Sequence, residues 1–181
     1  MTAFRYFKSH IERKYLNKDV PDEIIERLID AARNAPFGGG GVPSQHWEFI
    51  VVRDKETKRQ LAGEDQYLDF LAKAPVVIAC CVNIPKKFDY RDWTLTVSLA
   101  VKNLVLAANL YGLDALFINA HVNYQIQDTK YQKMKKILGL PENMQLITLI
   151  PTGYIETGKT SIPRITKELQ ETIHMEKFGK K

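Results

Sequence analysis

The sequence has little cysteine and no disulfide pattern. Its only two cysteines, Cys80 and Cys81, are neighbours in an apolar run. Adjacent cysteines do not readily close a disulfide, and two ligands without further spacing do not make a metal site. We therefore expect two small buried side chains on a strand, in a protein of a reducing compartment.

Motifs of hydrolytic and nucleotide-binding enzymes are also missing. The four histidines, His10, His46, His121 and His174, are far apart, and none belongs to a His-Glu-x-x-His pattern. No nucleophile elbow, Walker loop or dinucleotide-binding glycine fingerprint is present. We expect no metal and no catalytic side chain, so that a bound cofactor would carry any chemistry.

Charge of one sign does not dominate, and no apolar leader opens the chain. The 26 basic and 21 acidic side chains give a net charge of +5, and the bases are scattered. This balance suits anionic ligands, whereas nothing interleaves aromatic with basic residues as nucleic-acid binding requires. We expect a cytoplasmic protein with no nucleic-acid partner and no membrane attachment.

The periodicity of apolar residues predicts one α+β domain over the 181 residues. Alternating helical and strand patterns, with turn residues between them, carry this prediction. Pro151 within the last strand indicates a sheet edge or a bulge. Helices are expected over 2–15, 21–35, 55–62, 66–73, 94–111 and 129–138, strands over 49–52, 75–82, 114–118 and 146–155, a loop over 85–92 and a turn at 119–120.

Two segments indicate contacts with a second subunit. The helix over 94–111 is apolar almost all round, which is typical of a membrane span or of a helix packed on both sides. No second such segment exists, so we favour a central helix that also contacts a partner subunit. The polar tail over 156–181 has no clear apolar stripe, and it either frays or lies along a neighbouring surface.

The least ordinary stretch is the glycine-rich segment 37–44, which precedes Trp47 and a strand. Together with its surroundings it resembles the FMN-dependent nitroreductases. The resemblance rests on Arg13-Lys14-Tyr15, Ala35-Pro36, Gln45-His46-Trp47, Ala74-Pro75-Val76-Val77, Lys102-Asn103-Leu104, Gly112-Leu113, Gly153-Tyr154 and Arg164, which occur in the family's order over nearly the whole chain.

The resemblance implies a nitroreductase-like α+β fold with a central mixed or antiparallel sheet flanked by helices, in an intertwined homodimer. Residues 1–181 would form a single FMN-binding domain, whose arm from about 156 to 181 packs on the partner subunit. NADH or NADPH would reduce the flavin, and a small organic acceptor such as a nitroaromatic, a quinone or a flavin would then take its place in a ping-pong mechanism.

The resemblance also implies cofactor-binding positions. Arg13 would lie beside the flavin ring or ribityl chain, Arg164 would hold the phosphate, and Gln45 would bond the ribityl chain or ring edge. Main-chain contacts are expected from Pro36, Phe37, Gly38 and Ser44. The segment with Phe117, Asn119 and Ala120 matches the family turn whose amides face the hydride-accepting nitrogen.

The sequence departs from the family pattern at the N-terminus. The first two arginines of the family motif fall on Ser9 and His10, which leaves fewer charged groups for the phosphate. This departure keeps an alternative open: a non-catalytic dimeric protein of the same fold that binds a flavin or another small molecule. An iodotyrosine-deiodinase-like or flavin-destroying relative is a further possibility within the fold.

Overall fold

The structure is a computed structural model that describes residues 14–37, 46–83, 90–120, 129–156 and 167–180. The helix predicted over 2–15 lies outside these residues except at its end, where Tyr15 forms an isolated bridge with Ile155. Most of the glycine-rich segment also lies outside them.

Helix α1 (Asp22–Arg33) confirms the prediction that Pro21 opens a helix. Pro21 is the N-cap, with a φ of −58° and a ψ of 146°. Proline suits this place because its ring fixes φ near that value and its missing N–H would have no partner at the start of a helix. The acidic side chains of Asp22 and Glu23 stabilise the first turn, because they lie at the positive end of the helix dipole. The helix ends at Arg33, two residues short of the expected bound.

Among the described residues, five strands form one antiparallel sheet, which confirms the predicted α+β class. The strands are β1 (Trp47–Val52), β2 (Val76–Asn83), β3 (Asp114–Ala115), β4 (Ile118–Asn119) and β5 (Met144–Gly153). Their order is β1-β2-β5-β3, and β4 also pairs with β5. The long strand β5 therefore lies inside the sheet, with β2 on one side and the two short strands on the other.

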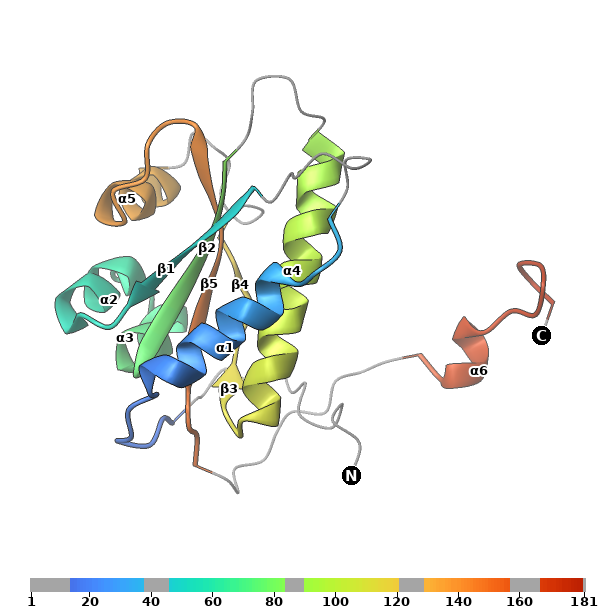
Figure 1. Cartoon of the computed structure of the whole chain (residues 1–181), viewed down its shortest axis with the longest axis horizontal. Coiled ribbons are helices and arrows are strands. Elements are labelled where there is room, and N and C mark those ends of the chain that lie inside the picture. Colours follow the sequence, from blue (N-terminus) through green and yellow to red (C-terminus); the bar gives the residue numbers. More distant parts are fainter. Residues whose placement is uncertain (1–13, 38–45, 84–89, 121–128, 157–166, 181) are drawn as a thin grey trace.

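Helices cover both faces of this sheet (Figure 1). Helices α1 and α4 (Tyr90–Leu110) pack on one face, while α2 (Lys55–Ala62), α3 (Asp69–Lys73) and α5 (Thr129–Ile137) pack on the other. Strand β2 alternates between the two cores, since Cys80 belongs to the first and Cys81 to the second. The two thiols are buried and unbridged, as expected.

Helix α4 starts earlier than the sequence indicated. The segment 85–92 was expected to be a loop, but the helix already begins at Tyr90. The prediction was wrong there because the polar residues of this segment suggested a loop, and helix ends are the part of an element that sequence patterns define least well. At its other end Gly112 adopts a φ of 71° and stops the helix, as expected.

The last two strand predictions need correction as well. The expected strand over 114–118 is split into β3 and β4, and Asn119 belongs to β4 rather than to a turn. Pro151 marks neither a sheet edge nor a bulge, because it pairs with Val77 near the end of β5, a strand that lies between β2 and β3. The bulge of β5 lies elsewhere: Cys80 pairs with Thr148 and Cys81 with Leu146, which leaves Ile147 as the extra residue.

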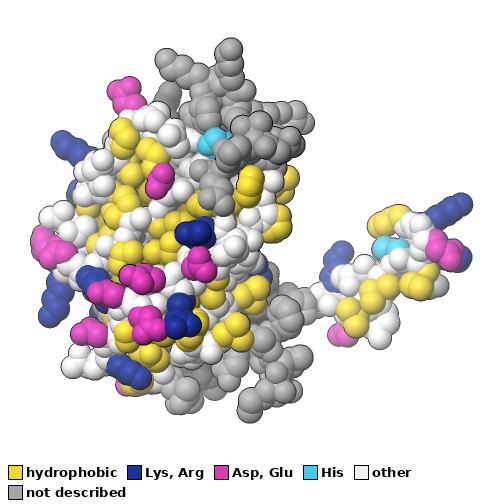
Figure 2. All heavy atoms as spheres, viewed as in Figure 1, with side chains coloured by type: hydrophobic (Ala, Val, Ile, Leu, Met, Phe, Trp, Pro, Cys, Tyr) yellow, Lys and Arg dark blue, Asp and Glu magenta, His cyan; other side chains and the backbone are white. Residues whose placement is uncertain are grey.

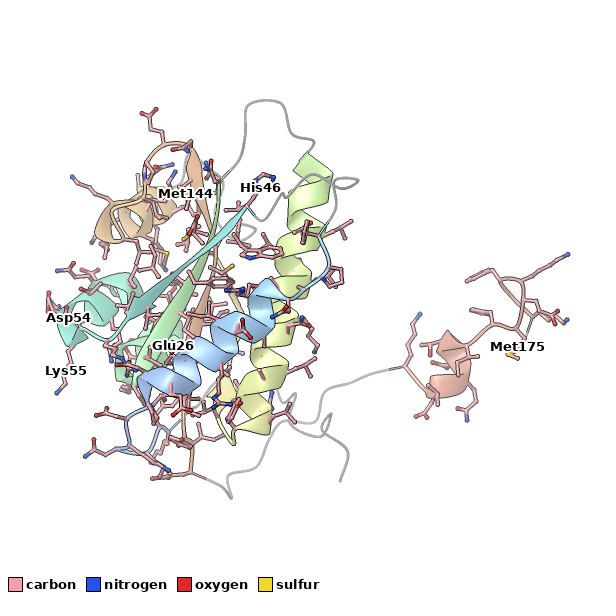
Figure 3. The ribbon with its side chains drawn as sticks, in the orientation of Figure 1. Glu26, His46, Asp54, Lys55, Met144 and Met175 are labelled. Carbon is pink, nitrogen blue, oxygen red and sulfur yellow. The ribbon has the colours of Figure 1, made fainter. Side chains whose placement is uncertain are left out.

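The described part of the tail lies away from the sheet and its helices (Figure 1). It contains the short helix α6 (Leu169–Thr172), and its apolar side chains are open to solvent: Leu169, Ile173, Met175 and Phe178. Figure 2 shows these apolar side chains gathered along the tail, and Figure 3 places Met175 there. No helix among the described residues has the length and apolar character to cross a membrane.

Candidate functional site

The predicted cofactor-binding residues that the structure describes fall into two groups. The first group follows α1 and consists of Pro36 and Phe37, both exposed. The Phe37 ring meets Trp47 edge to face, with 6.1 Å between ring centroids and an interplanar angle of 79°. Trp47 begins β1, and Figure 3 shows its neighbour His46 at the end of β1 opposite to Asp54.

The second group lies on the other side of the sheet, in and beside β4. Phe117 is 44% exposed, while Ala120 is almost completely buried. Because β2 and β5 separate β1 from β4, these two strands lie about 14 Å apart across the sheet, at about 4.8 Å per strand spacing. Phe37 contacts the start of β1 at Trp47, whereas Phe117 and Asn119 lie at the β4 edge.

The main-chain N–H groups around β4 point alternately towards β5 and away from it. Leu116 N–H donates to the Pro151 carbonyl at 3.3 Å, and Ala120 N–H donates to the Ile147 carbonyl at 3.1 Å. Residues two apart on a strand direct their N–H groups to the same side, so 116, 118 and 120 face β5. The N–H groups of Phe117 and Asn119 consequently point away from β5, towards an edge of the sheet that no described strand covers.

Because of this alternation, the N–H groups of the predicted segment have two different roles. Phe117 and Asn119 present main-chain donors outward, next to an exposed aromatic ring. Ala120 uses its N–H to hold the segment against β5. An open strand edge of this kind is a ready-made set of hydrogen-bonding groups for a ligand.

The segment that carries the N-terminal motif is anchored at the end of β5. Leu16 N–H donates to the Tyr154 carbonyl at 2.8 Å, and Glu156 N–H donates to the Lys14 carbonyl at 3.0 Å. Arg13 directly precedes Lys14 in the sequence, and Arg164 follows Glu156 by eight residues. The predicted site residues outside the described part of the chain are Ser9, His10, Arg13, Gly38, Ser44, Gln45 and Arg164.

Shifted pKa values among the described residues belong to the scaffold. Burial raises the pKa of the Cys80 thiol and raises that of Cys81 to about 12, so both stay protonated and unreactive near neutral pH. Burial also lowers the pKa of Lys58, whose ammonium donates to the Ala74 carbonyl at 2.5 Å and the Pro75 carbonyl at 3.1 Å.

The two thiols lie in the cores, and Lys58 ties α2 to the start of β2. The described residues also hold no group of three or more His, Cys, Asp or Glu able to bind a metal ion. The chemistry available at the β4 edge is therefore hydrogen bonding and apolar contact, which suits a bound organic cofactor.

Two residues under this edge were not singled out as functional from the sequence. Thr148 donates its hydroxyl to the Ile118 carbonyl at 2.7 Å, and Pro151 lies opposite the break between β3 and β4. Pro151 gave a signal, because proline is unusual in the interior of a sheet. Thr148 gave none, since a threonine in an apolar strand is common.

A family model, described as the nitroreductase family, matches residues 8–64 and 62–154. The chain belongs to the nitroreductase family. This confirms the resemblance drawn from the sequence motifs. At the level of class, it supports an oxidoreductase of the nitroreductase type.

Relatives and solved structures agree with this membership. The chain is 29% identical to a protein of Archaeoglobus fulgidus named "Putative NADH dehydrogenase/NAD(P)H nitroreductase", over 92% of each chain. It is 30% identical to a protein of the same name from Methanothermobacter thermautotrophicus, over 92% of this chain and 82% of the relative. A Parabacteroides distasonis structure, also of that name, superposes with a TM-score of 0.75 at 29% identity, over 94% and 95% of the two chains.

Structures of lower identity show that the fold is shared. An FMN-dependent nitroreductase from Clostridium difficile superposes with a TM-score of 0.76 at 24% identity, over 98% of this chain and all of the other. An iodotyrosine deiodinase bound to FMN and 3-iodo-L-tyrosine superposes with a TM-score of 0.66 at 22% identity, over 90% and 94%. The predicted nitroreductase-like fold is thereby confirmed.

Proposed function

We propose that this protein is an FMN-dependent oxidoreductase that passes electrons from NADH or NADPH to a small organic acceptor such as a nitroaromatic, a quinone or a flavin. The observation that carries the proposal is the open edge at β4, with its outward N–H groups at Phe117 and Asn119, in a chain of the nitroreductase family. The named activities of the relatives point to the same chemistry.

The described groups fit a flavin in their chemistry. A flavin offers a large planar apolar surface with hydrogen-bond acceptors along its edge. The exposed Phe117 ring supplies apolar contact, and the neighbouring main-chain N–H groups supply donors that do not depend on protonation state. When bound, FMN would supply the hydride-accepting and hydride-donating chemistry that no described side chain supplies.

The remaining assignments come from the family motifs. We assign Arg164 to the phosphate, where a guanidinium makes charge-assisted, bidentate bonds. Arg13 would stabilise negative charge that builds on the ring, and Gln45 would bond the ribityl chain or ring edge. Ser9 and His10 replace family arginines, so they would add hydrogen bonds to the phosphate end in place of permanent charge.

A homodimer completes the site in this proposal. The group at Pro36 and Phe37 of one protomer would join the Phe117 edge of its partner, since β1, which Phe37 contacts through Trp47, is about 14 Å from β4 by strand spacing. Helix α4 offers an apolar stripe for the contact, in which Leu95, Leu99 and Leu110 are 67%, 45% and 77% exposed. Residues 156–181 would pack on the partner, covering the exposed apolar side chains of the tail. The cytoplasmic location remains a prediction.

The phosphate assignment is tested by titrating the protein with FMN and following the quenching of flavin fluorescence. Arg164→Ala should weaken FMN binding roughly tenfold to a hundredfold, because a hydrogen bond to a charged group is worth about 1.5–3 kcal/mol. Lys167→Ala, which removes an exposed charge three residues away, is the control and should bind as the wild type does. Unchanged FMN affinity in Arg164→Ala would refute the assignment.

Steady-state kinetics separate the enzyme from the alternative reading. Oxidation of NADH or NADPH that depends on both FMN and an added nitroaromatic or quinone supports the proposed activity. Tight FMN binding with no such oxidation would instead support a non-catalytic flavin-binding protein of the same fold.

A further inference from the structure

Pro151 occupies a position where a sheet normally needs an N–H donor. The pairing of Ala115 with Thr152 and of Ile118 with Leu149 follows one continuous register, in which residue 116 would face 151. Leu116 N–H does donate to the Pro151 carbonyl, but proline has no N–H to return to the Leu116 carbonyl. The ladder is interrupted there, and the strand is split into β3 and β4.

Beyond the break, two contacts add to the strand pairing that holds β4 against β5. The Thr148 hydroxyl, which is completely buried, donates to the Ile118 carbonyl at 2.7 Å. The bulge at Ile147 presents a carbonyl that accepts from Ala120 N–H at 3.1 Å. Bulges occur preferentially beside functional sites, where they redirect a strand.

We propose that Pro151 and Thr148 are positioning residues for the cofactor: they hold β4 so that the N–H groups of Phe117 and Asn119 meet the edge of the flavin. This rests on the proposed function. Pro151 leaves the Leu116 carbonyl without its ladder donor, and Thr148 fixes Ile118 two residues on, so the direction of the outward donors is set from inside the sheet.

The alternative is that Pro151 has no effect on cofactor binding. A central proline costs one ladder hydrogen bond and has a low strand propensity, so a β-branched residue would suit β5 better on stability alone. Exceptions to local rules concentrate at functional sites. This exception faces the segment that carries the predicted cofactor contacts, and it acts on its main chain directly.

Pro151→Val tests the first residue. Amide hydrogen exchange of the variant without flavin should show a protected main-chain N–H at position 151, because the restored donor can bond the Leu116 carbonyl. The melting temperature should stay the same or rise, while FMN should bind roughly three- to tenfold more weakly, the effect of losing about one well-directed hydrogen bond. Two results would overturn the proposal: an unprotected N–H at position 151, or a protected N–H at position 151 together with unchanged FMN affinity.

Thr148→Val tests the second residue, and the sheet supplies a matched control. Thr152 is equally buried on the same strand, but its hydroxyl donates to the Ile150 carbonyl within β5, at 3.1 Å. Thr148→Val should weaken FMN binding roughly three- to tenfold. Thr148→Ser keeps the hydroxyl and should bind FMN as the wild type does, and Thr152→Val should also leave FMN binding unchanged. Equal losses in the two valine variants would mean that the buried hydroxyls matter only for stability, which contradicts the proposal.

Failure of this inference and failure of the proposed function give different results. If the wild-type protein does not bind FMN at all, the proposed function fails, and with it the reason for positioning. If the wild type binds FMN while Pro151→Val and Thr148→Val bind it equally well, only the positioning role is wrong.

Discussion

At the scale of single residues, Gly153 shows how closely the end of β5 is packed. A β-carbon built at this position would lie 2.5 Å from Cδ of Pro75 and 2.8 Å from Cδ1 of Tyr15. Real carbon atoms do not approach so closely, and both neighbours belong to segments fixed by the main chain. The need for glycine here comes from space, because its φ is not in the left-handed region.

Gly153→Ala should therefore destabilise the protein by about 1–3 kcal/mol, the usual cost of overpacking a well-packed site. Chemical denaturation followed by circular dichroism measures this loss. Gly139→Ala is the control, since its φ of 65° strains an alanine although no atom lies within 4 Å of the added carbon. It should cost roughly 1 kcal/mol through the backbone alone. A Gly153→Ala variant as stable as wild type would show that Pro75 and Tyr15 can move apart.

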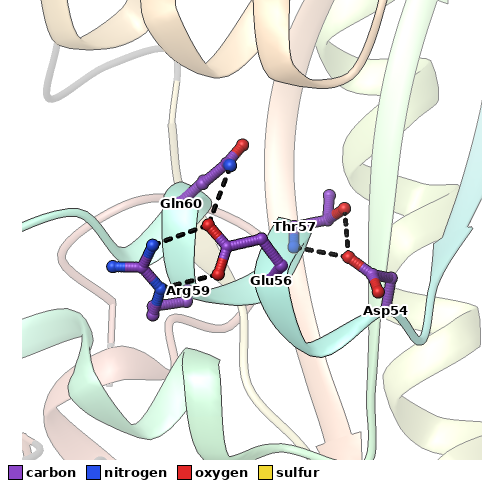
Figure 4. Close-up of polar contacts among 5 residues, drawn as sticks. All are labelled: Asp54, Glu56, Thr57, Arg59 and Gln60. Carbon is purple, nitrogen blue, oxygen red and sulfur yellow. Dashed lines mark hydrogen bonds and ion pairs between the residues drawn. The ribbon is translucent and has the colours of Figure 1, made fainter.

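At the scale of elements, helix α2 depends on a cap that the sequence indicates. Asp54 accepts hydrogen bonds from the main-chain N–H and the hydroxyl of Thr57, both at 2.7 Å (Figure 4). These bonds, that from the Thr57 main chain first, lower the pKa of the Asp54 carboxyl below its usual value of 3.8. The ionised carboxylate is thus the form that the folded helix prefers.

Asp54→Ala should lower the melting temperature near neutral pH, because an N–H of the first turn loses its acceptor. The pKa is depressed in the folded state, so the charge-dependent stabilisation is present above the usual pKa of 3.8 and is lost as pH falls through the folded pKa. Asp54→Asn keeps a capping acceptor, so it should retain most of the stability near neutral pH and show less of this acid dependence. Melting curves of the three proteins from about pH 7 to about pH 2.5 test this; parallel curves for Asp54→Ala and wild type would contradict it.

Elements with a strong local signal could be predicted, and those set by their neighbours could not. Pro21, Asp54 and Gly112 indicate helix ends, and the apolar run of β2 indicates a strand buried on both faces. The split between β3 and β4 was not predictable from residues 114–119 themselves. It arises from Pro151, which lies much further along the chain, through the register of β5.

The candidate site shows the same division. Family motifs singled out Phe37, Phe117 and Asn119, yet no pattern in the sequence indicated that Phe37 contacts β1 whereas Phe117 lies beside β4, with β2 and β5 between these two strands. Strand order is a property of the whole fold, since it depends on which strand pairs with β5 on each side. The direction of the Phe117 N–H likewise follows from pairing, and periodicity alone does not give it.

At the scale of the whole molecule, the account requires two copies of the chain. Leu95, Leu99 and Leu110 recur on one side of α4 at helical spacing and are exposed in the single chain. An apolar stripe of this kind, on a helix whose other side packs against α1, indicates an interface. Under the proposed function, in which residues of two protomers complete the site, FMN binding would depend on association.

Leu99→Glu should therefore shift the protein from dimer to monomer in light scattering at micromolar concentration, because it places a charge in the apolar interface. FMN binding should weaken in the same variant. Val51→Glu is the control, since it makes the same type of change at an exposed apolar side chain on β1. A wild-type protein that is monomeric and still holds FMN would contradict the dimer.

The visible absorption spectrum of the purified protein, recorded after incubation with FMN and again after anaerobic addition of NADH or NADPH, tests the central claim most directly. The account predicts flavin bands that stay with the protein through gel filtration and bleach when the nicotinamide is added. A protein that remains colourless after incubation with FMN would contradict it, and would show that the changes at Ser9 and His10 have removed cofactor binding from this nitroreductase fold.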